Sequence, residues 1–447
     1  MITQSYVNFC TLTTSTTSQM EPLLDLSSFV DKIADKTWGE IDEFLPRIAS
    51  KRPFQLDETK YQEFFSKVES KYLTDDSGSI PDFLLVELGY VFGMNRVGSP
   101  TFWKKLTNQV SSKASKIPVE LVARFIYGTT FVGTVDPRFW DEVENGLQQN
   151  PEILNVNILS YLMPSMLRNL RGNSEAESAP LLTKESSIMA ILDEQPLWST
   201  LRDNADSFID EADVMALSEI CTSLAAVNYA DEGFWISAQE RFFELKEKMD
   251  EIQILSIVES FGQVKQGNSD FWQEIESYTL ANHETLQTST ITSMLTGFAG
   301  AGEGSFRFWN ELSNYLFDLN LPADHLGNLI VSLGNYDLLS ESKWQALEEK
   351  ALEKLAEFSL EGILNLIVGF GNRGKGSQEL WNSIEERLLG LNDIPQKAQL
   401  VLYCNLKMVN KLTPDLASHF HMVSESGDKV LEMMRMAQEA QAEQEEA

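Results

Sequence analysis

Tryptophan recurs along this chain at a nearly constant interval. The nine tryptophans of the 447-residue sequence run from Trp38 to Trp381, with successive gaps of 65, 37, 58, 37, 37, 37, 35 and 37 residues. The gap of 65 resolves into 27 and 38 if Phe65 replaces a tryptophan, and the gap of 58 into 37 plus an insertion of 21. A fixed period in this range is typical of a stacked repeat array, in which each unit buries its apolar face only against its neighbours.

The residues around each tryptophan predict the start of a helix. Five repeats carry Phe directly before it, at Phe102, Phe139, Phe234, Phe271 and Phe308. Four residues before it stands a side chain that suits a helix N-cap, as in Ser99, Asp136, Asp231, Asn268, Ser305, Ser340 and Ser377. Pro100 and Pro137 then fall at the first helical position, where a missing N–H costs nothing. Each Phe-Trp pair is therefore expected in the first turn of a helix.

A second apolar stretch precedes each cap and ends in small residues. Ten residues before the tryptophan the side chain is small, at Gly93, Thr130, Ala225, Gly262, Ala299, Gly334 and Gly371. The position before it is usually large, at Phe92, Leu224, Phe261, Phe298, Leu333 and Phe370. This pattern predicts another helix that ends on glycine, and a small residue there also lets neighbouring backbones approach.

The pattern predicts an all-α chain, an α-solenoid of about nine paired-helix repeats of 37 residues. We expect a polar N-terminal segment at 1–25, the repeat array at 26–412, and a C-terminal cap with an acidic helical tail at 413–447. The insertion is expected near 165–190, with a solvated loop at about 171–182.

Charge and cysteine content narrow the possible partners and location. Lys plus Arg number 35 against 67 Asp plus Glu, a net charge of −32. This excess opposes binding to phosphate backbones and to anionic membranes, and favours protein partners with neutral or basic surfaces. The three cysteines, Cys10, Cys221 and Cys404, lie far apart, which excludes a disulfide scaffold and indicates a reducing compartment. No apolar run is long enough to span a membrane.

The paired-helix unit of 37 residues, with Gly297-Phe-Ala leading to Ser305-Phe-Arg-Phe-Trp309, resembles the heptatricopeptide and octotricopeptide repeats of organellar proteins. It also resembles the helical region of FAST-kinase-like proteins, over about residues 60 to 410. No RAP module is recognisable at the C-terminal end. The resemblance implies organellar RNA binding or a place in an organellar ribonucleoprotein. The uncharged N-terminal segment predicts a cytoplasmic protein, with a mitochondrial or plastid location as the alternative.

Two motifs resemble ligand sites. The segment from Gly369 to Ser377 differs at one residue from the pattern of a phosphate-binding loop, because Gly376 stands where Ser or Thr would hold magnesium. Gly297 to Ser305 occupies the same place in an earlier repeat without the lysine, so a repeat turn is expected and Lys375 should be dispensable. His419 and His421 lack a clear third ligand and are expected to be a surface pair.

The aromatic and acidic residues also allow two interpretations each. The Phe-Trp pairs could stack on bases or a peptide, but their regularity favours core anchors. Glu142, Glu274 and Glu311 recur two residues after a tryptophan, where they suit the helix dipole. The alternative is an acidic ridge that captures a basic segment of a partner.

No catalytic, cofactor-binding or metal-binding residue emerges from the sequence, so we expect no enzyme, no cofactor and no small-molecule substrate. The leading hypothesis is a non-catalytic scaffold or adaptor subunit that binds other proteins within a larger assembly. The alternative is an organellar RNA-binding or ribonucleoprotein subunit. An RNA-binding array should line one face with cations, whereas here they scatter, as in Lys104, Lys105, Arg241, Lys246 and Arg387.

Overall fold

The computed structural model describes residues 26–45, 48, 58–75, 80–133, 135–173, 192, 194–229, 231–335, 339–391 and 394–445. These residues form α-helices joined by turns and short 3-10 helices, and none of them lies in a strand. The fold is an all-α solenoid, as the period predicts. The polar segment at 1–25, with Cys10, lies outside the described residues.

The chain divides into two compact units, and the boundary falls within one helix, α13. In the described part of unit 1 (to Asn173, then Gln195 to Ile220), the α-helices are α2 (Leu26–Asp31), α3 (Trp38–Asp42), α5 (Glu58–Thr74), α6 (Asp82–Met94), α7 (Pro100–Ser111), α8 (Val119–Thr130), α9 (Pro137–Gln149), α10 (Val156–Asn173), α12 (Pro196–Phe208) and the first half of α13 (Val214–Ala225). The 3-10 helices are η2 (Ile33–Asp35), η4 (Ala114–Lys116), η5 (Pro151–Ile153) and η7 (Ile209–Glu211).

Unit 2 takes the chain from Cys221 onward. Its described α-helices after α13 are α14 (Glu232–Leu245), α15 (Glu251–Val264), α16 (Ser269–Asn282), α17 (Thr288–Ala301), α18 (Phe306–Asp318), α19 (Ala323–Asn335), α20 (Glu341–Glu353), α21 (Leu360–Asn372), α22 (Gln378–Leu389), α23 (Gln396–Met408), α24 (Pro414–His419) and α25 (His421–Glu445). The 3-10 helices η8 (Lys246–Lys248) and η9 (Leu355–Glu357) follow α14 and α20.

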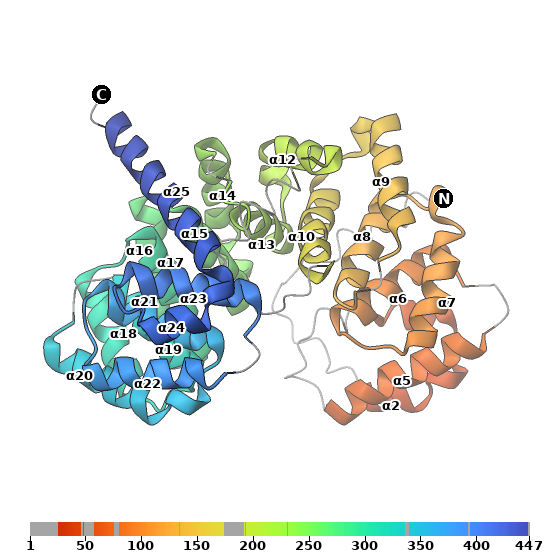
Figure 1. The fold of residues 1–447 in the computed structure, drawn as a ribbon. Helices are drawn as coiled ribbons and strands as arrows, with labels where there is room; N and C mark the ends of the chain where they lie inside the picture. The colour runs from red at the N-terminus through yellow and green to blue at the C-terminus, as the bar shows by residue number, and fades with distance from the viewer. Residues whose placement is uncertain are drawn as a thin grey trace. The chain divides into compact units, whose positions relative to one another are not determined.

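Each repeat consists of an A helix followed by a B helix that carries the aromatic anchor. The A helices are α6, α8, α10, α13, α15, α17, α19, α21 and α23, and the B helices are α5, α7, α9, α12, α14, α16, α18, α20 and α22. Successive A helices of unit 2 pack on one another from α15 to α23. Figure 1 shows α17, α19, α21 and α23 next to one another in teal and blue, with α20 and α22 in a second row beside them.

The predicted N-caps are confirmed in most B helices. The side chains of six of them accept a backbone N–H of the first turn: Ser99, Asp136, Asp231, Asn268, Ser305 and Ser377. Ser340 occupies the N-cap of α20 without such a bond. Because each cap satisfies an orphan N–H, the short B helices begin at a fixed distance before their anchors.

The small residues lie at or near the ends of the A helices, as predicted, and Thr130 and Ala225 are the last residues of α8 and α13. The glycines, however, do not close the helices. Gly93 and Gly262 lie inside α6 and α15, one or two residues before the helix ends. A Cβ on Gly262 would lie 2.2 Å from the carbonyl oxygen of Gly297, and one on Gly93 would lie 1.9 Å from that of Gly128. These glycines therefore serve the second predicted purpose, which is close contact between the backbones of neighbouring A helices.

Trp38 is not an anchor of a B helix. It is the first residue of α3, directly after its N-cap Thr37, and α3 packs on the A helix α6. Phe65 does hold the anchor position of α5, where it is buried. The short gap of 27 residues between Trp38 and Phe65 therefore reflects a change of layer at Trp38.

The helix α10 extends into the segment predicted as the insertion, and the helices α24 and α25 lie in the segment predicted as the C-terminal cap. The A helix α10 continues through Asn173, whereas residues 174–191 and 193 lie outside the described residues. At the other end, α25 packs on α23, and a Cβ on Gly427 would lie 2.5 Å from the ring of Tyr403. Among the described residues, no helix combines the length and apolar character needed to cross a membrane.

Candidate functional site

The Phe-Trp pairs form the core between repeats, as the regularity of the pairs predicts. All five phenylalanines before the tryptophans are fully buried. Of the tryptophans, Trp103, Trp198, Trp235, Trp272, Trp309, Trp344 and Trp381 are buried, whereas Trp38 and Trp140 are half-buried. In three repeats the centre of this Phe ring lies 4.2 to 4.4 Å from the ring centre of the last phenylalanine of the A helix. The pairs are Phe102 and Phe92, Phe271 and Phe261, and Phe308 and Phe298. The phenylalanine rings therefore offer no exposed stacking platform.

Each anchor also holds the turn before it. The indole N–H donates to the carbonyl oxygen six residues earlier at 2.7 to 3.2 Å in Trp103, Trp235, Trp272, Trp309 and Trp381. A glycine with positive φ lies five residues before four of these tryptophans: Gly98, Gly267, Gly304 and Gly376. A Cβ on any of the four would lie 2.7 to 2.9 Å from the indole nitrogen, so only glycine fits there.

The lysine-containing turn that resembles a phosphate-binding loop is a repeat turn. Gly369 lies inside the helix α21, and the N–H of Lys375 donates to the carbonyl of Phe370 at 2.8 Å. The equivalent bond of Glu303 to Phe298 is 2.9 Å, and the same bond occurs after α6, α13, α15 and α23. The Lys375 ammonium pairs with Glu341. This bond pattern is the common way to end a helix on a left-handed residue, and Lys375 is not needed for it.

The histidine pair and the cysteines show no reactive arrangement. His421 is exposed at the start of α25, and one of its ring nitrogens lies 3.0 Å from the carbonyl of Ser418. Among the described residues, no three His, Cys, Asp or Glu side chains come together as metal ligands. Cys221 and Cys404 are buried, and burial raises the pKa of both thiols, the reverse of what a nucleophilic cysteine needs.

A hollow of about 490 Å³ in unit 1 opens beside Trp103. Its other lining residues are Gly98, Pro100, Lys104, Thr107, Asn108 and Val132. Lys104 is the one titratable side chain among these residues. A single exposed lysine supplies neither a general acid–base pair nor an activated nucleophile.

Two of the three glutamates of the predicted acidic ridge are paired, and the third, Glu142 on α9, is half-buried. Glu274 pairs with Lys246 at 2.5 Å, and Glu311 pairs with Arg307 one turn earlier at 2.9 Å. In several B helices the residue four positions after the anchor binds the next repeat through its acidic or amide side chain. This side chain accepts a hydrogen bond from the backbone N–H of the next N-cap at 2.8 to 3.0 Å. The N-cap donors and their acceptors are Ser99 and Glu69, Asn268 and Gln239, Ser305 and Glu276, and Ser377 and Glu348.

Four of the five scattered cations have structural partners, whereas Lys104 is exposed. The Lys105 ammonium donates to three carbonyls at the end of α5, those of Tyr72, Leu73 and Asp75, at 2.9 to 3.2 Å. Arg387 lies 3.4 Å from the carbonyl of Ala356, and Arg241 pairs with Glu244 at 2.5 Å. Cations at helix ends satisfy unpaired carbonyls and complement the helix dipole.

A position that the sequence analysis did not single out connects the A helices. It lies sixteen residues before each anchor, or thirty-seven before Trp198, where the insertion adds 21 residues, and we call it the ladder position. From α6 to α21 it is occupied by Glu87, Arg124, Tyr161, Glu219, Ser256, Ser293, Asn328 and Asn365. The residue types differ so much that only the constant offset from the tryptophans could have revealed it. The two units use this position differently.

In unit 1 the ladder side chains of α6, α8 and α10 pack against one another: Glu87 and Tyr161 are buried, and Arg124 is half-buried. Arg124 lies 2.9 Å from Glu87 and donates to the Tyr161 hydroxyl at 3.1 Å, and its guanidinium lies 4.1 Å from the centre of the Tyr90 ring. Burial raises the pKa of Glu87, and the neighbouring Arg124 opposes that shift. This face of unit 1 therefore satisfies its own charges.

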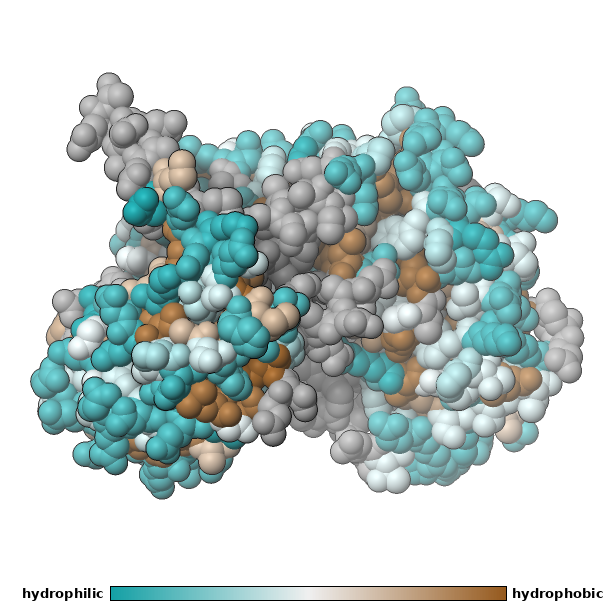
Figure 2. All heavy atoms as spheres, viewed as in Figure 1, coloured by the Kyte–Doolittle hydropathy of each residue, from teal (hydrophilic) through white to brown (hydrophobic). Residues whose placement is uncertain are grey.

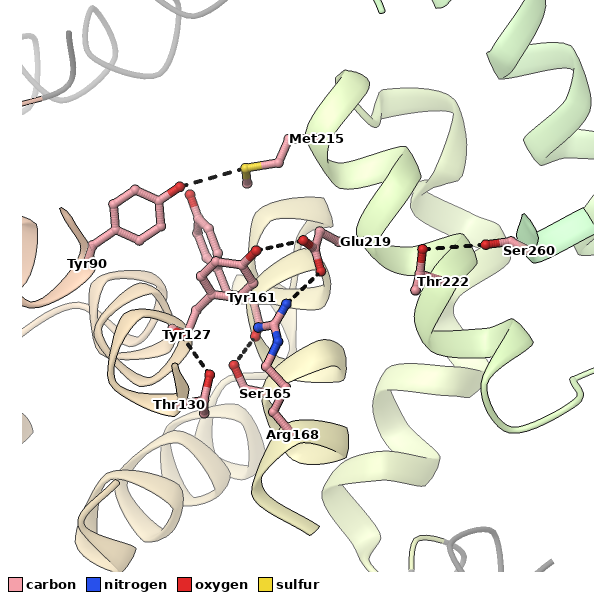
Figure 3. Close-up of polar contacts among 10 residues, drawn as sticks. All are labelled: Tyr90, Tyr127, Thr130, Tyr161, Ser165, Arg168, Met215, Glu219, Thr222 and Ser260. Atoms are coloured by element: carbon pink, nitrogen blue, oxygen red, sulfur yellow. Dashed lines mark hydrogen bonds and ion pairs between the residues drawn. The ribbon is translucent and has the colours of Figure 1, made fainter. Parts of the chain in front are cut away.

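A second charged group completes the cluster in unit 1 (Figure 3). Glu219 accepts from the Tyr127 hydroxyl at 2.6 Å and from Arg168 at 3.2 Å. The Arg168 guanidinium also lies 4.6 Å from the centre of the Tyr127 ring. Burial raises the pKa of Tyr127, and the Glu219 carboxylate raises it further. Tyr127 is 1% exposed, so the cluster offers its rings to no ligand.

In unit 2 the ladder position carries short polar side chains that are half-buried. Asn365 donates to the side-chain carbonyl of Asn328 at 2.8 Å. Thr296, one turn further along α17, is exposed and lies 3.1 Å from the Ser332 hydroxyl. The four helices α15, α17, α19 and α21 contain neither lysine nor arginine. Their acidic residues are Glu251, Glu259, Asp324 and Glu361.

The B helices carry a more charged surface. On the face shown in Figure 2, hydrophilic side chains predominate over α20 and α22, with smaller hydrophobic areas between them. The lysines and arginines of unit 2 lie on these helices, in the turns and from α23 onward. The two layers of unit 2 are therefore chemically different.

No family model matches this chain, and none of the curated proteins with which it was compared matches it.

Proposed function

We propose that this protein is a non-catalytic α-solenoid scaffold or adaptor that binds other proteins within a larger assembly. The absence of lysine and arginine from α15, α17, α19 and α21 carries this proposal. A surface that binds phosphates needs cations, because their neutralisation drives nucleic-acid binding. A polar, weakly acidic layer suits a neutral or basic protein surface.

The organellar RNA-binding alternative rests on the repeat resemblance alone. Two arginines of the unit 1 A helices, Arg124 and Arg168, are paired with Glu87 and Glu219. Freeing them for phosphates would leave one buried and one half-buried carboxylate without partners, which is unfavourable. The net charge of −32 also repels a polyanion at long range. We therefore favour a protein partner.

Capture of the tagged chain from its native organism, with and without nuclease, tests the proposal. We expect one or a few proteins in near-stoichiometric amounts that resist nuclease. The variant Thr296→Arg places a cation on an exposed site of the A layer and should release them. Ser277→Arg, on an exposed site of the B helix α16, is the matched control and should retain them. Retention of RNA, with loss of the proteins after nuclease, would favour the ribonucleoprotein alternative.

A further inference from the structure

The ladder position of unit 2 has the chemistry of a peptide-backbone receptor. Asn328 and Asn365 each present a carboxamide, which can donate two hydrogen bonds and accept two. Their mutual bond uses one donor of Asn365 and one acceptor site of Asn328. The remaining groups have no hydrogen-bond partner among the described residues, and both side chains are half-buried rather than enclosed. A carboxamide has the same donor and acceptor as the peptide group.

The spacing of the ladder suits an extended chain. The A helices pack with their backbones in contact, and a Cβ on Gly334 would lie 2.6 Å from the Cα of Gly369. Such contact places helix axes at the short end of the usual range of about 8–10 Å. An extended peptide covers that distance in two to three residues at about 3.3 Å each. A segment that crosses α19 and α21 can therefore meet both asparagines with alternate residues.

The side chains that flank the ladder are acidic. Asp324 and Glu361 lie four residues before Asn328 and Asn365, and Glu259 lies three residues after Ser256. Residues three or four apart share a helix face, so these carboxylates border the ladder. All three are exposed. Asp324 also accepts the N–H of Ser359 at 3.0 Å, which fixes its position.

We infer that the A-helix face of α15, α17, α19 and α21 binds an extended, lysine- or arginine-bearing segment of a partner protein. Asn328 and Asn365 hydrogen-bond the backbone of this segment, and Asp324, Glu361 and Glu259 attract its basic side chains. The inference deepens the proposed scaffold function and rests on it. An acidic peptide and a nucleic acid are disfavoured by the same charges.

Fluorescence anisotropy with the full chain tests the inference. The probe is a labelled ten-residue peptide of alternating lysine and serine, with an alternating glutamate–serine peptide and a 20-nucleotide polyuridine as comparisons. We expect the basic peptide to bind in low salt and to weaken as salt rises, and the other two probes to bind at least tenfold more weakly. Equal or tighter binding of the acidic peptide or the RNA would overturn the charge assignment.

Two further measurements test the asparagines. Asn328→Ala/Asn365→Ala should weaken the basic peptide about tenfold, whereas Asn382→Ala, an exposed asparagine of the B helix α22, should not. N-methylation of the peptide's serine nitrogens should weaken binding to the wild-type chain similarly and should have little further effect in the double variant. The comparison of the methylated and unmethylated peptides on the wild-type chain tests backbone recognition even if the double variant fails to fold. Equal affinity of the methylated and unmethylated peptides would refute backbone recognition.

A charge variant separates this inference from the proposed function. Asp324→Asn/Glu361→Gln should weaken the basic peptide several-fold, and Glu379→Gln on α22 should leave it unchanged. If all ladder variants bind the peptide like the wild type while Thr296→Arg still releases native partners, the inference fails and the scaffold function stands. If Thr296→Arg retains the partners as well, the proposed function of this face fails too.

Discussion

The Trp272 side chain allows the role of the anchors to be tested quantitatively. It is 2% exposed, and its ring centre lies 5.1 Å from that of Phe271 and 4.8 Å from that of Phe298. Its indole N–H donates to the carbonyl of Gln266 at 3.1 Å. The side chain thus fills space between α15, α16 and α17 and holds the turn that joins α15 to α16.

Two substitutions separate these contributions. Trp272→Ala removes the whole side chain, and truncation of a core aromatic costs about 3–5 kcal/mol of unfolding free energy. Trp272→Phe keeps an aromatic ring and loses the bond to Gln266, a loss of about 1 kcal/mol plus a small cavity. Phe65 shows that phenylalanine fits this position, because it is buried at the anchor site of α5. We therefore expect about 1–2 kcal/mol for Trp272→Phe.

Urea unfolding followed by circular dichroism gives the totals, and hydrogen exchange locates the loss. Because repeats interact mainly with their neighbours, protection should fall most at the amides of α15 to α17. Trp140→Ala is the matched control, since Trp140 is half-buried, and it should cost clearly less than Trp272→Ala. A cost below about 1 kcal/mol for Trp272→Ala would refute the core assignment and restore the anchors as candidate stacking surfaces.

Three further outcomes are expected. Gly262→Ala should lower the melting temperature, because its Cβ would meet backbone at 2.2 Å, whereas Gly233→Ala on the exposed first turn of α14 should leave it unchanged or raise it. Burial, with Glu87 nearby, raises the pKa of Asp42 from 3.8 to about 6, so the free energy of unfolding should fall by up to about 3 kcal/mol as pH rises from about 4 to 6. The variant Asp42→Asn should lack this pH-dependent contribution when both proteins are unfolded in urea across this pH range. Identical pH profiles of the two proteins would contradict the prediction. Magnesium ATP should leave the melting temperature unchanged, and an upward shift that Lys375→Ala abolishes would show a phosphate site.

Local interactions explain why much of the fold is readable from the sequence. The N-cap of α18, Ser305, contacts the N–H of Phe308, three residues away. The turn before it is closed by a bond between Glu303 and Phe298, five residues apart. Both devices repeat with the tryptophans, so their residue types recur at fixed offsets and reveal the helix starts and turns.

Trp38 shows the limit of this approach. It lies only 27 residues before Phe65, yet the recurrence of tryptophan places it in the series of anchors. It begins an A-layer helix, and its indole N–H donates to Asp75 at 2.6 Å rather than to the preceding turn. Spacing along one chain does not distinguish two layers of helices when both contain aromatic residues. The packing of α3 on α6 decides the layer.

The sequence by itself determined the period, the paired helices and their starts, because caps, turns and helix periodicity depend on residues a few positions apart. Only the tertiary structure decided what the A-helix positions do. Glycines such as Gly262 could end a helix or let one helix approach another, and the 2.2 Å distance to the Gly297 carbonyl selects the second. The ladder, from the Arg124 cluster to Asn328 and Asn365, depends on side chains 37 residues apart that meet only when neighbouring A helices are packed.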